Sequence, residues 1–208
     1  MTSQERSGLL ELLDGRSGHF QLESGHHGEL WLDLDALLLR PALLSPYLDV
    51  LARRLAEAVD PDAICGPLLG GALVASAVAT ALDRELYVAE PVSPAGPPGE
   101  LFRARYAVPE PVRTRLAGRQ VAVLDDVVNA ASATRATVAD LRAAGATVVA
   151  IGALLVLGDR AADYAEREGV PLVYVESLPN RIWAPEACPM CASDEPLEDL
   201  RRSADGSG

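Results

Sequence analysis

The segment that most constrains the fold of this 208-residue chain runs from Thr147 to Leu157 and is apolar at nearly every position. A strand with one face in water would alternate apolar and polar residues, so this strand must be covered on both faces. Strands of that kind belong to parallel sheets, whose connections are usually helices. The run therefore predicts a parallel sheet between two layers of helix.

The rest of the chain alternates between strand and helix patterns. A helix is expected from Pro41, a good first-turn residue, to about residue 58. Two more are expected over residues 72–82 and over residues 133–144, the latter ended by Gly145. Strands are expected at residues 63–65, 86–89, 120–124, 147–157 and 171–175. This alternation predicts a doubly wound, mostly parallel α/β sheet, with its ligand outside the carboxyl ends of the strands.

Two stretches depart from the alternation. A helix over residues 3–13 and two short strands, at 19–23 and 30–35, are expected before the first long helix. Residues 91–118 contain six prolines, three glycines and four arginines, and we expect no regular structure there. A connection of that length is either disordered or functional, and a mobile lid over the ligand is the interpretation we favour.

Charge and composition exclude several classes of function. The chain has 30 acidic and 18 basic residues, a net charge of −12, which disfavours binding to nucleic acid. No apolar stretch approaches the roughly 18 residues of a membrane span, and the first residues do not resemble a signal peptide. We therefore expect a cytoplasmic protein that binds neither membrane nor nucleic acid.

All 18 basic residues are arginines. The absence of lysine excludes Schiff-base chemistry, attachment of pyridoxal phosphate, the P-loop and the kinase lysine. Any anion site in this chain must use arginine, backbone N–H groups or a metal ion.

The strongest functional motif spans residues 121–134. An apolar strand leads to two adjacent carboxylates, Asp125 and Asp126, which we expect at its exposed edge. Small residues then lead into a helix, whose free N–H groups and positive dipole end favour a phosphate. Two carboxylates beside a phosphate site suit the vicinal hydroxyls of a sugar phosphate. The alternative is that both are ordinary loop and capping residues.

This motif resembles the 5-phosphoribosyl-1-diphosphate motif of type I phosphoribosyltransferases: four apolar residues, two acids, two apolar residues and a small-residue loop. Other stretches resemble the orotate branch of that family, in matching order and spacing over residues 8–198. They are residues 18–28, 66–72, and 188–191 with 196–197. The resemblance implies the family fold, an α/β doubly wound sheet with a small N-terminal hood of short strands and a helix.

The resemblance also implies a domain organisation. Residues 1–200 would form one domain, in which residues 1–40 and the C-terminal segment make the hood. Residues 201–208 are polar and small, and we expect them to be a disordered tail.

Roles for individual residues follow from the same resemblance. Asp125 and Asp126 would bind the ribose hydroxyls and stabilise the positive charge that develops on the sugar. Arg103 and Arg105 would hold the leaving diphosphate, which arginine can bind bidentately. The expected substrate-binding residues are Leu68, Leu69, Gly70 and Gly71 at the diphosphate, Asn129, Ala130, Ala131, Ser132 and Ala133 at the 5-phosphate, Arg160 at the orotate carboxylate, and Phe20, Ser24 and Gly25. For Arg160 the alternative is a solvated surface arginine.

A magnesium ion is the implied cofactor. It would bridge diphosphate and ribose oxygens, mostly through substrate and water, as its octahedral shell prefers. The implied partners are phosphoribosyl diphosphate, a nucleobase and a second copy of the chain in a homodimer.

Several positions depart from the family pattern. The phosphate loop has alanines where the family usually has at least one glycine, and alanine requires more ordinary backbone dihedrals. The lysines common in the family's mobile loop are absent. Glu23 stands where many orotate enzymes have lysine, and an acid there should repel an anionic pyrimidine.

Three hypotheses therefore remain open. The leading one is an enzyme of pyrimidine nucleotide synthesis that transfers the 5-phosphoribosyl group to orotate and releases diphosphate. The others are a paralogue acting on another base and a non-catalytic protein that binds phosphoribosyl diphosphate.

Cys188 and Cys191 form a lone C-x-x-C pair. A structural zinc site needs four ligands, and Cys65 is distant in sequence. The histidines could complete such a site only through folding or dimerisation; they are His19, His26 and His27. A structural turn is the favoured interpretation, and no residue is assigned to a metal.

Overall fold

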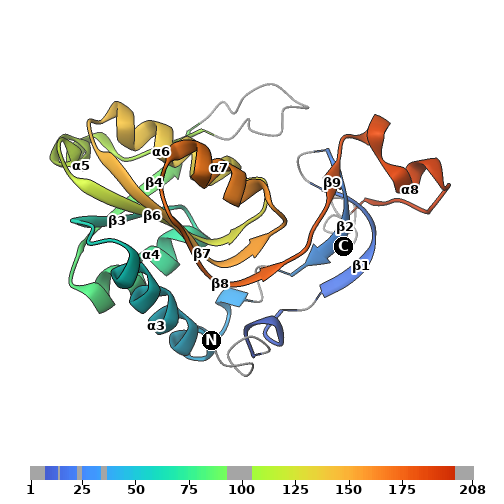
Figure 1. The fold of residues 1–208 in the computed structure, drawn as a ribbon, viewed down its shortest axis with the longest axis horizontal. Coiled ribbons are helices and arrows are strands. Elements are labelled where there is room, and N and C mark those ends of the chain that lie inside the picture. The colour runs from blue at the N-terminus through green and yellow to red at the C-terminus, as the bar shows by residue number, and fades with distance from the viewer. Residues whose placement is uncertain (1–7, 14, 23–24, 34–36, 93–104, 200–208) are drawn as a thin grey trace, which may run out of the picture.

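The long apolar run lies inside a six-stranded sheet, called the core sheet here, in the order β5-β4-β3-β6-β7-β8. This is seen in a computed structural model, which describes residues 8–13, 15–22, 25–33, 37–92 and 105–199 (Figure 1). All neighbouring strands are parallel except β4 and β5, which are antiparallel. The strands are β3 (Ala63–Pro67), β4 (Glu85–Pro91), β5 (Tyr106–Ala107), β6 (Gln120–Val128), β7 (Thr147–Leu157) and β8 (Leu172–Leu178).

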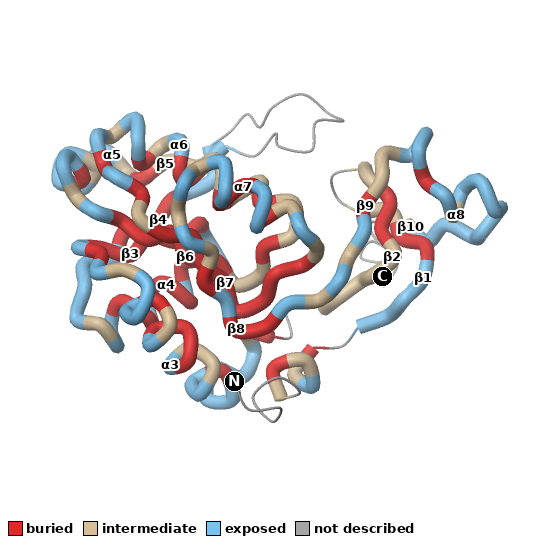
Figure 2. The backbone as a smooth tube through the Cα atoms, in the orientation of Figure 1, coloured by how far each residue is buried: buried red, intermediate tan, exposed pale blue. Residues whose placement is uncertain are grey.

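Helices cover both faces of the core sheet, as the sequence predicts (Figure 1). On β7, Leu154 packs with residues of two helices on one face, and its neighbour Ala153 packs with residues of two others on the opposite face. This is why β7 is buried along nearly its whole length (Figure 2). The first pair is α3 (Pro41–Ala58) and α4 (Gly70–Leu82), and the second is α6 (Ser132–Ala143) and α7 (Arg160–Glu168). None of the helices in the described ranges is both long and apolar enough to span a bilayer.

A second, four-stranded sheet lies to one side of the core sheet (Figure 1). We call it the hood sheet; its order is β10-β1-β2-β9, so it joins strands from both ends of the chain. Its strands are β1 (Gly15–Gln21), β2 (His27–Leu32), β9 (Ile182–Trp183) and β10 (Glu198–Asp199), and the short helices η2 (Pro185–Ala187) and α8 (Pro189–Ala192) lie between the last two. The expected hood of short strands is thus confirmed.

The chain ends are only partly described. Residues 8–10 are helical, while residues 3–7 of the expected first helix lie outside the described residues. The expected disordered tail, residues 201–208, also lies outside them. The assignment of residues 1–200 to one domain stays a prediction.

The expectation of no regular structure over residues 91–118 is wrong for its second half. Residues 105–118 contain β5, α5 (Glu110–Arg113) and η1 (Thr114–Leu116). The Asp140 carboxylate on α6 accepts hydrogen bonds from the Val108 backbone N–H, at 2.9 Å, and from the Arg113 guanidinium. These hydrogen bonds to α6 hold residues 105–118 in regular structure, which their composition alone does not predict. Residues 93–104, including the glycine- and proline-rich part of the expected lid, lie outside the described residues.

Candidate functional site

The strand order reverses between β3 and β6. From β3 the chain continues outward to β4 on one side, and from β6 it continues to β7 and β8 on the other. In doubly wound sheets, ligands bind at such a switch point, beyond the carboxyl ends of the strands. The acid pair Asp125–Asp126 lies on β6 at this position.

The structure corrects the expectation that both acids lie at an exposed strand edge. β6 does not end at Leu124 but continues to Val128, because β7 is long enough to pair with it to the end. Asp125 is therefore buried, at 8% exposure, while Asp126 is half-buried. The pair is part of the sheet, with one carboxylate inside and one facing the site.

Short polar contacts hold the two carboxylates. The Thr134 hydroxyl donates to Asp125 Oδ2 at 3.3 Å, and the Asp126 backbone N–H donates to Asp125 Oδ1 at 3.1 Å. The Val127 N–H donates to Asp126 Oδ1 at 2.8 Å. Burial, and then the negative charge of Asp126, raise the pKa of Asp125 well above its ordinary value. A buried carboxylate beside a half-buried one suits a ligand that brings hydrogen-bond donors or positive charge.

Two glycines at the start of α4 pack directly against this pair. A Cβ on Gly70 would lie 2.1 Å from Asp126 Oδ2, and a Cβ on Gly71 would lie 2.7 Å from Asp125 Oδ1. Leu68 and Leu69, joined by a cis peptide bond, precede them and are exposed. The structure thus brings the expected diphosphate loop into contact with the expected ribose-binding acids.

The expected 5-phosphate loop leads from β6 into α6. Ala131 has φ 61° and ψ 26°, so the expectation of ordinary dihedrals in an alanine loop is wrong at this residue. The left-handed conformation costs an alanine about 1–2 kcal/mol, and it turns the chain so that α6 begins at once with Ser132 and Ala133. Asn129 Oδ1 accepts a hydrogen bond from Asn180 Nδ2 at 3.2 Å, and Ala130 completes the loop. α6 thus begins at Ser132, after the end of β6 and a loop of three residues.

Phe20 and Gly25 are in the hood, not at the edge of the core sheet. Phe20 is buried in β1, and Gly25, with φ 83°, forms the tight turn that follows this strand. Arg160 stands at the start of α7, and its Nη2 donates to the Ile182 carbonyl on β9 at 3.4 Å. Arg160 therefore links the two sheets, whereas the structure does not place Phe20 or Gly25 with the acid pair.

Two expected site residues, Ser24 and Arg103, lie outside the described residues. Arg105 is described and exposed, and its carbonyl accepts a hydrogen bond from the Val92 N–H at 2.9 Å. This hydrogen bond thus joins the residue before the undescribed segment 93–104 to the residue after it.

Sequence reasoning missed three residues near the site. Thr134 binds Asp125, and its only sequence signal is that it ends the motif. Burial raises the pKa of Tyr106 on β5, and the negative charges of Asp125 and Asp126 raise it further. Asn180 contacts Asn129 in the expected phosphate loop from beyond β8, and no local pattern indicates it.

A pocket of about 490 Å³ lies between the core sheet and the hood. Asp159 lines it from the core side and Glu29 from the hood side, with Asn180 and Arg181 on the connection between them. Glu29 holds Arg181 through both carboxylate oxygens, at 3.0 and 3.2 Å. The pocket adjoins both the phosphate loop, through Asn180, and Arg160, which follows Asp159.

Comparison with known proteins gives consistent similarities. The model of the phosphoribosyl transferase domain family matches residues 46–190. An orotate phosphoribosyltransferase of Heliobacterium modesticaldum is 32% identical over 184 residues, 86% of each chain. One from Carboxydothermus hydrogenoformans is 27% identical over 194 residues, covering 93% of this chain and 91% of its own.

Solved structures show the same similarity. The crystal structure of orotate phosphoribosyltransferase from Aeropyrum pernix superposes with a TM-score of 0.61 at 27% identity, covering 79% of this chain and 88% of its own. An adenine phosphoribosyl transferase from Trypanosoma brucei reaches a TM-score of 0.64 at 16% identity, covering 83% and 79%, a likeness of fold alone.

Proposed function

Because the chain belongs to the phosphoribosyl transferase family, we propose that it transfers the 5-phosphoribosyl group from phosphoribosyl diphosphate to orotate and releases diphosphate. The observation that carries the proposal is the contact between the Asp125–Asp126 pair and Gly70–Gly71 at the switch point of the sheet. This contact supports a binding site in which carboxylates for the sugar hydroxyls would lie next to a backbone loop for the diphosphate.

The acid pair would bind the ribose. Asp126 is half-buried and lies against Gly70 at the start of α4, where its carboxylate would accept a hydrogen bond from a sugar hydroxyl. As the bond to diphosphate breaks, positive charge develops on the sugar ring, and two fixed carboxylates next to it stabilise that charge. The raised pKa of Asp125 means that positive charge nearby would also favour its ionised form.

The phosphates would be bound by backbone and arginine. The N-terminus of α6 offers unpaired N–H groups to the 5-phosphate, with Ser132 and Asn129 able to donate hydrogen bonds. Since the chain has no lysine, charge for the diphosphate would come from Arg103 and Arg105 on the connection between β4 and β5.

Magnesium fits the donor set of this site. Carboxylate oxygens such as those of Asp126, together with phosphate and ribose oxygens, are the hard ligands that Mg²⁺ prefers. When bound, the ion would neutralise the diphosphate and so make it a better leaving group. Asp125 and Asp126 would orient the sugar for this step.

The base would lie between the core sheet and the hood. Arg160 at this junction is a fixed cation that suits the carboxylate of orotate, and the relatives named above act on orotate by name. A homodimer located in the cytoplasm is part of the same proposal, and light scattering on the purified chain tests the dimer.

The test is diphosphate release by the purified chain with magnesium and phosphoribosyl diphosphate, measured separately with orotate, uracil and adenine. We expect turnover with orotate, and its loss in the Asp125→Asn/Asp126→Asn double variant. Asp60→Asn is the matched control, because Asp60 is an exposed acid just before β3, at the opposite end of the sheet. Turnover with another base alone would refute the choice of orotate, and ligand-dependent thermal stabilisation without turnover would refute catalysis.

A further inference from the structure

The C-terminal part of the chain has almost no hydrophobic anchor. Between Trp183 and Asp199 the only buried residue is Cys188, and neither η2 nor α8 buries a side chain in an apolar core. Its main polar attachments are the pairing of β10 with β1 and the exposed Arg16–Glu198 ion pair, which contributes little. A segment with so little buried apolar surface usually needs a covalent or metal cross-link to stay folded.

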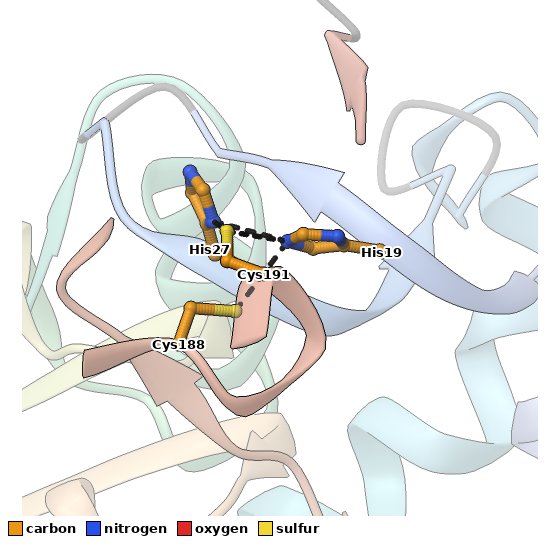
Figure 3. Close-up of side chains that lie close together, drawn as sticks. All are labelled: His19, His27, Cys188 and Cys191. Carbon is orange, nitrogen blue, oxygen red and sulfur yellow. Dashed lines mark hydrogen bonds between the residues drawn. The ribbon is translucent and has the colours of Figure 1, made fainter. Parts of the chain in front are cut away.

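Four metal-ligand side chains meet where this segment joins the hood sheet. His19 comes from β1, His27 from β2, Cys188 precedes α8 and Cys191 lies within it; Figure 3 shows the four pointing toward one another. One ligand atom from each lies within 4.8 Å of the other three. His19, His27 and Cys188 are buried, so the cluster is closed on most sides.

The distances between these atoms fit the corners of one tetrahedron. With Zn–N near 2.0–2.1 Å and Zn–S near 2.3 Å, tetrahedral corners are about 3.3 Å apart for two nitrogens and about 3.6 Å for nitrogen and sulfur. His19 Nε2 lies 3.0 Å from His27 Nδ1 and 3.4 Å from Cys188 Sγ. Cys191 Sγ lies 3.7 Å from His19 Nε2 and 3.2 Å from His27 Nδ1. These four separations are within about half an ångström of the ideal values, and the two remaining pairs, both of which involve Cys188 Sγ, lie within 4.8 Å, so small side-chain movements would bring the four atoms around one ion.

The outer contact of His19 also matches a metal ligand. Its Nδ1 lies 2.9 Å from the Glu195 carbonyl oxygen, so the ring donates its N–H there. In the neutral ring that hydrogen bond leaves the lone pair on Nε2, and Nε2 is directed at the cluster. Ligating histidines almost always donate their other N–H to a carbonyl or carboxylate in this way. Glu195 belongs to the same C-terminal segment. Both ring nitrogens of His19 therefore contact this segment from the hood sheet.

We propose that His19, His27, Cys188 and Cys191 bind a structural Zn²⁺ ion that fastens the C-terminal segment to the hood sheet. Two thiolates and two imidazoles in a tetrahedron are a donor set typical of zinc, and four protein ligands leave no open position for catalysis. This proposal takes the metal-site alternative for the C-x-x-C pair in place of a structural turn. The sequence did not reveal the site because the two halves lie 169 residues apart, from His19 to Cys188.

The experiment measures metal content in the full chain, produced with zinc in the medium and without a histidine tag. After gel filtration we expect about one zinc ion per chain by mass spectrometry. Cys188→Ser and Cys191→Ser should each bring this ratio close to zero. His26→Asn is the matched control, because His26 is next to the cluster but is not one of its four members, and it should keep the zinc.

Cobalt substitution tests the geometry without any variant, so a failure of the cysteine variants to fold does not leave the question open. Co²⁺ added to the metal-free wild-type chain should give the intense visible bands of a tetrahedral ion and a thiolate charge-transfer band. Removal of zinc by a chelator should also speed hydrogen exchange across residues 183–199 while leaving β7 unchanged.

Three results would overturn the proposal. One is wild-type protein that retains no zinc after saturation, and another is cobalt with an octahedral spectrum. The third is a thiol count in denaturant, without reductant, that finds only Cys65 free, because Cys188 and Cys191 would then form a disulfide instead.

Discussion

Replacing Gly70 by alanine should impair the site without unfolding the protein. The new Cβ would lie 2.1 Å from Oδ2 of Asp126, 2.4 Å from its Cγ and 2.9 Å from Oδ1. Carbon and oxygen normally approach no closer than about 3.3 Å. The Asp126 carboxylate must therefore retreat by roughly 1.2 Å, which also breaks the 2.8 Å hydrogen bond from the Val127 N–H.

The expected loss is in catalysis rather than in stability. A displacement of about 1 Å at a substrate-positioning group costs roughly a hundredfold in rate, equivalent to about 2.7 kcal/mol of transition-state stabilisation. For stability, the lost hydrogen bond costs about 1 kcal/mol, and the gain in helix propensity at the start of α4 offsets up to about 1 kcal/mol. The free energy of unfolding should thus change by about 1 kcal/mol or less.

Gly66→Ala is the contrasting variant. A Cβ on Gly66 would lie 2.2 Å from the Gly71 carbonyl oxygen and 2.8 Å from the Ala72 nitrogen, both backbone atoms that cannot rotate away. It would force β3 and α4 apart, at a cost of about 1–3 kcal/mol or more. We therefore expect a clear fall in melting temperature for Gly66→Ala and little change for Gly70→Ala.

Steady-state kinetics with phosphoribosyl diphosphate, magnesium and orotate, together with thermal melting, decide the matter. Wild-type kcat/KM in Gly70→Ala would refute the role of Asp126 in binding ribose. A large loss of stability in that variant would instead refute the inference that the carboxylate can move aside.

Three further predictions follow from buried polar groups. The folded-state pKa of Asp125 is raised, so its protonated form contributes stability that is fully present below the ordinary pKa of 3.8 and is lost as the pH rises through the folded-state value. Asp125→Asn should therefore have a higher melting temperature than wild type at pH 7. This difference in melting temperature should vanish toward pH 4. Burial raises the pKa of the Cys65 thiol to about 12, so a thiol reagent at pH 8 should label Cys65 only after denaturant is added, and labelling in the folded chain would show that β3 opens. Asp140→Ala leaves the Val108 N–H without its acceptor and removes the carboxylate partner of Arg113, whose Nη2 keeps only its bond to the backbone carbonyl of residue 140. The variant should lower the free energy of unfolding by about 2 kcal/mol in urea titrations; an unchanged midpoint would mean that this contact does not order residues 105–118.

Local patterns in the sequence were sufficient for most of the core sheet. The apolar run Thr147–Leu157 and the helix Pro41–Ala58 have the bounds that their patterns predict, because burial on both faces and a proline at the helix start are properties of the segment itself. Gly145, with φ 85°, follows α6 where a helix stop was expected. The acid pair was identified for the same reason, since strand, acids and small-residue loop are consecutive in the chain.

Only the tertiary structure decided features that depend on distant segments. β6 carries its acids inside the sheet because β7 pairs with it to Val128, and Asp125 is buried for that reason. Ala131, the residue just before α6, adopts the left-handed conformation against its own backbone preference. His19 and Cys188 meet although 169 residues separate them. Sequence periodicity reports which face of an element is buried, whereas contacts between elements are set by how the sheets pair, which no local pattern records.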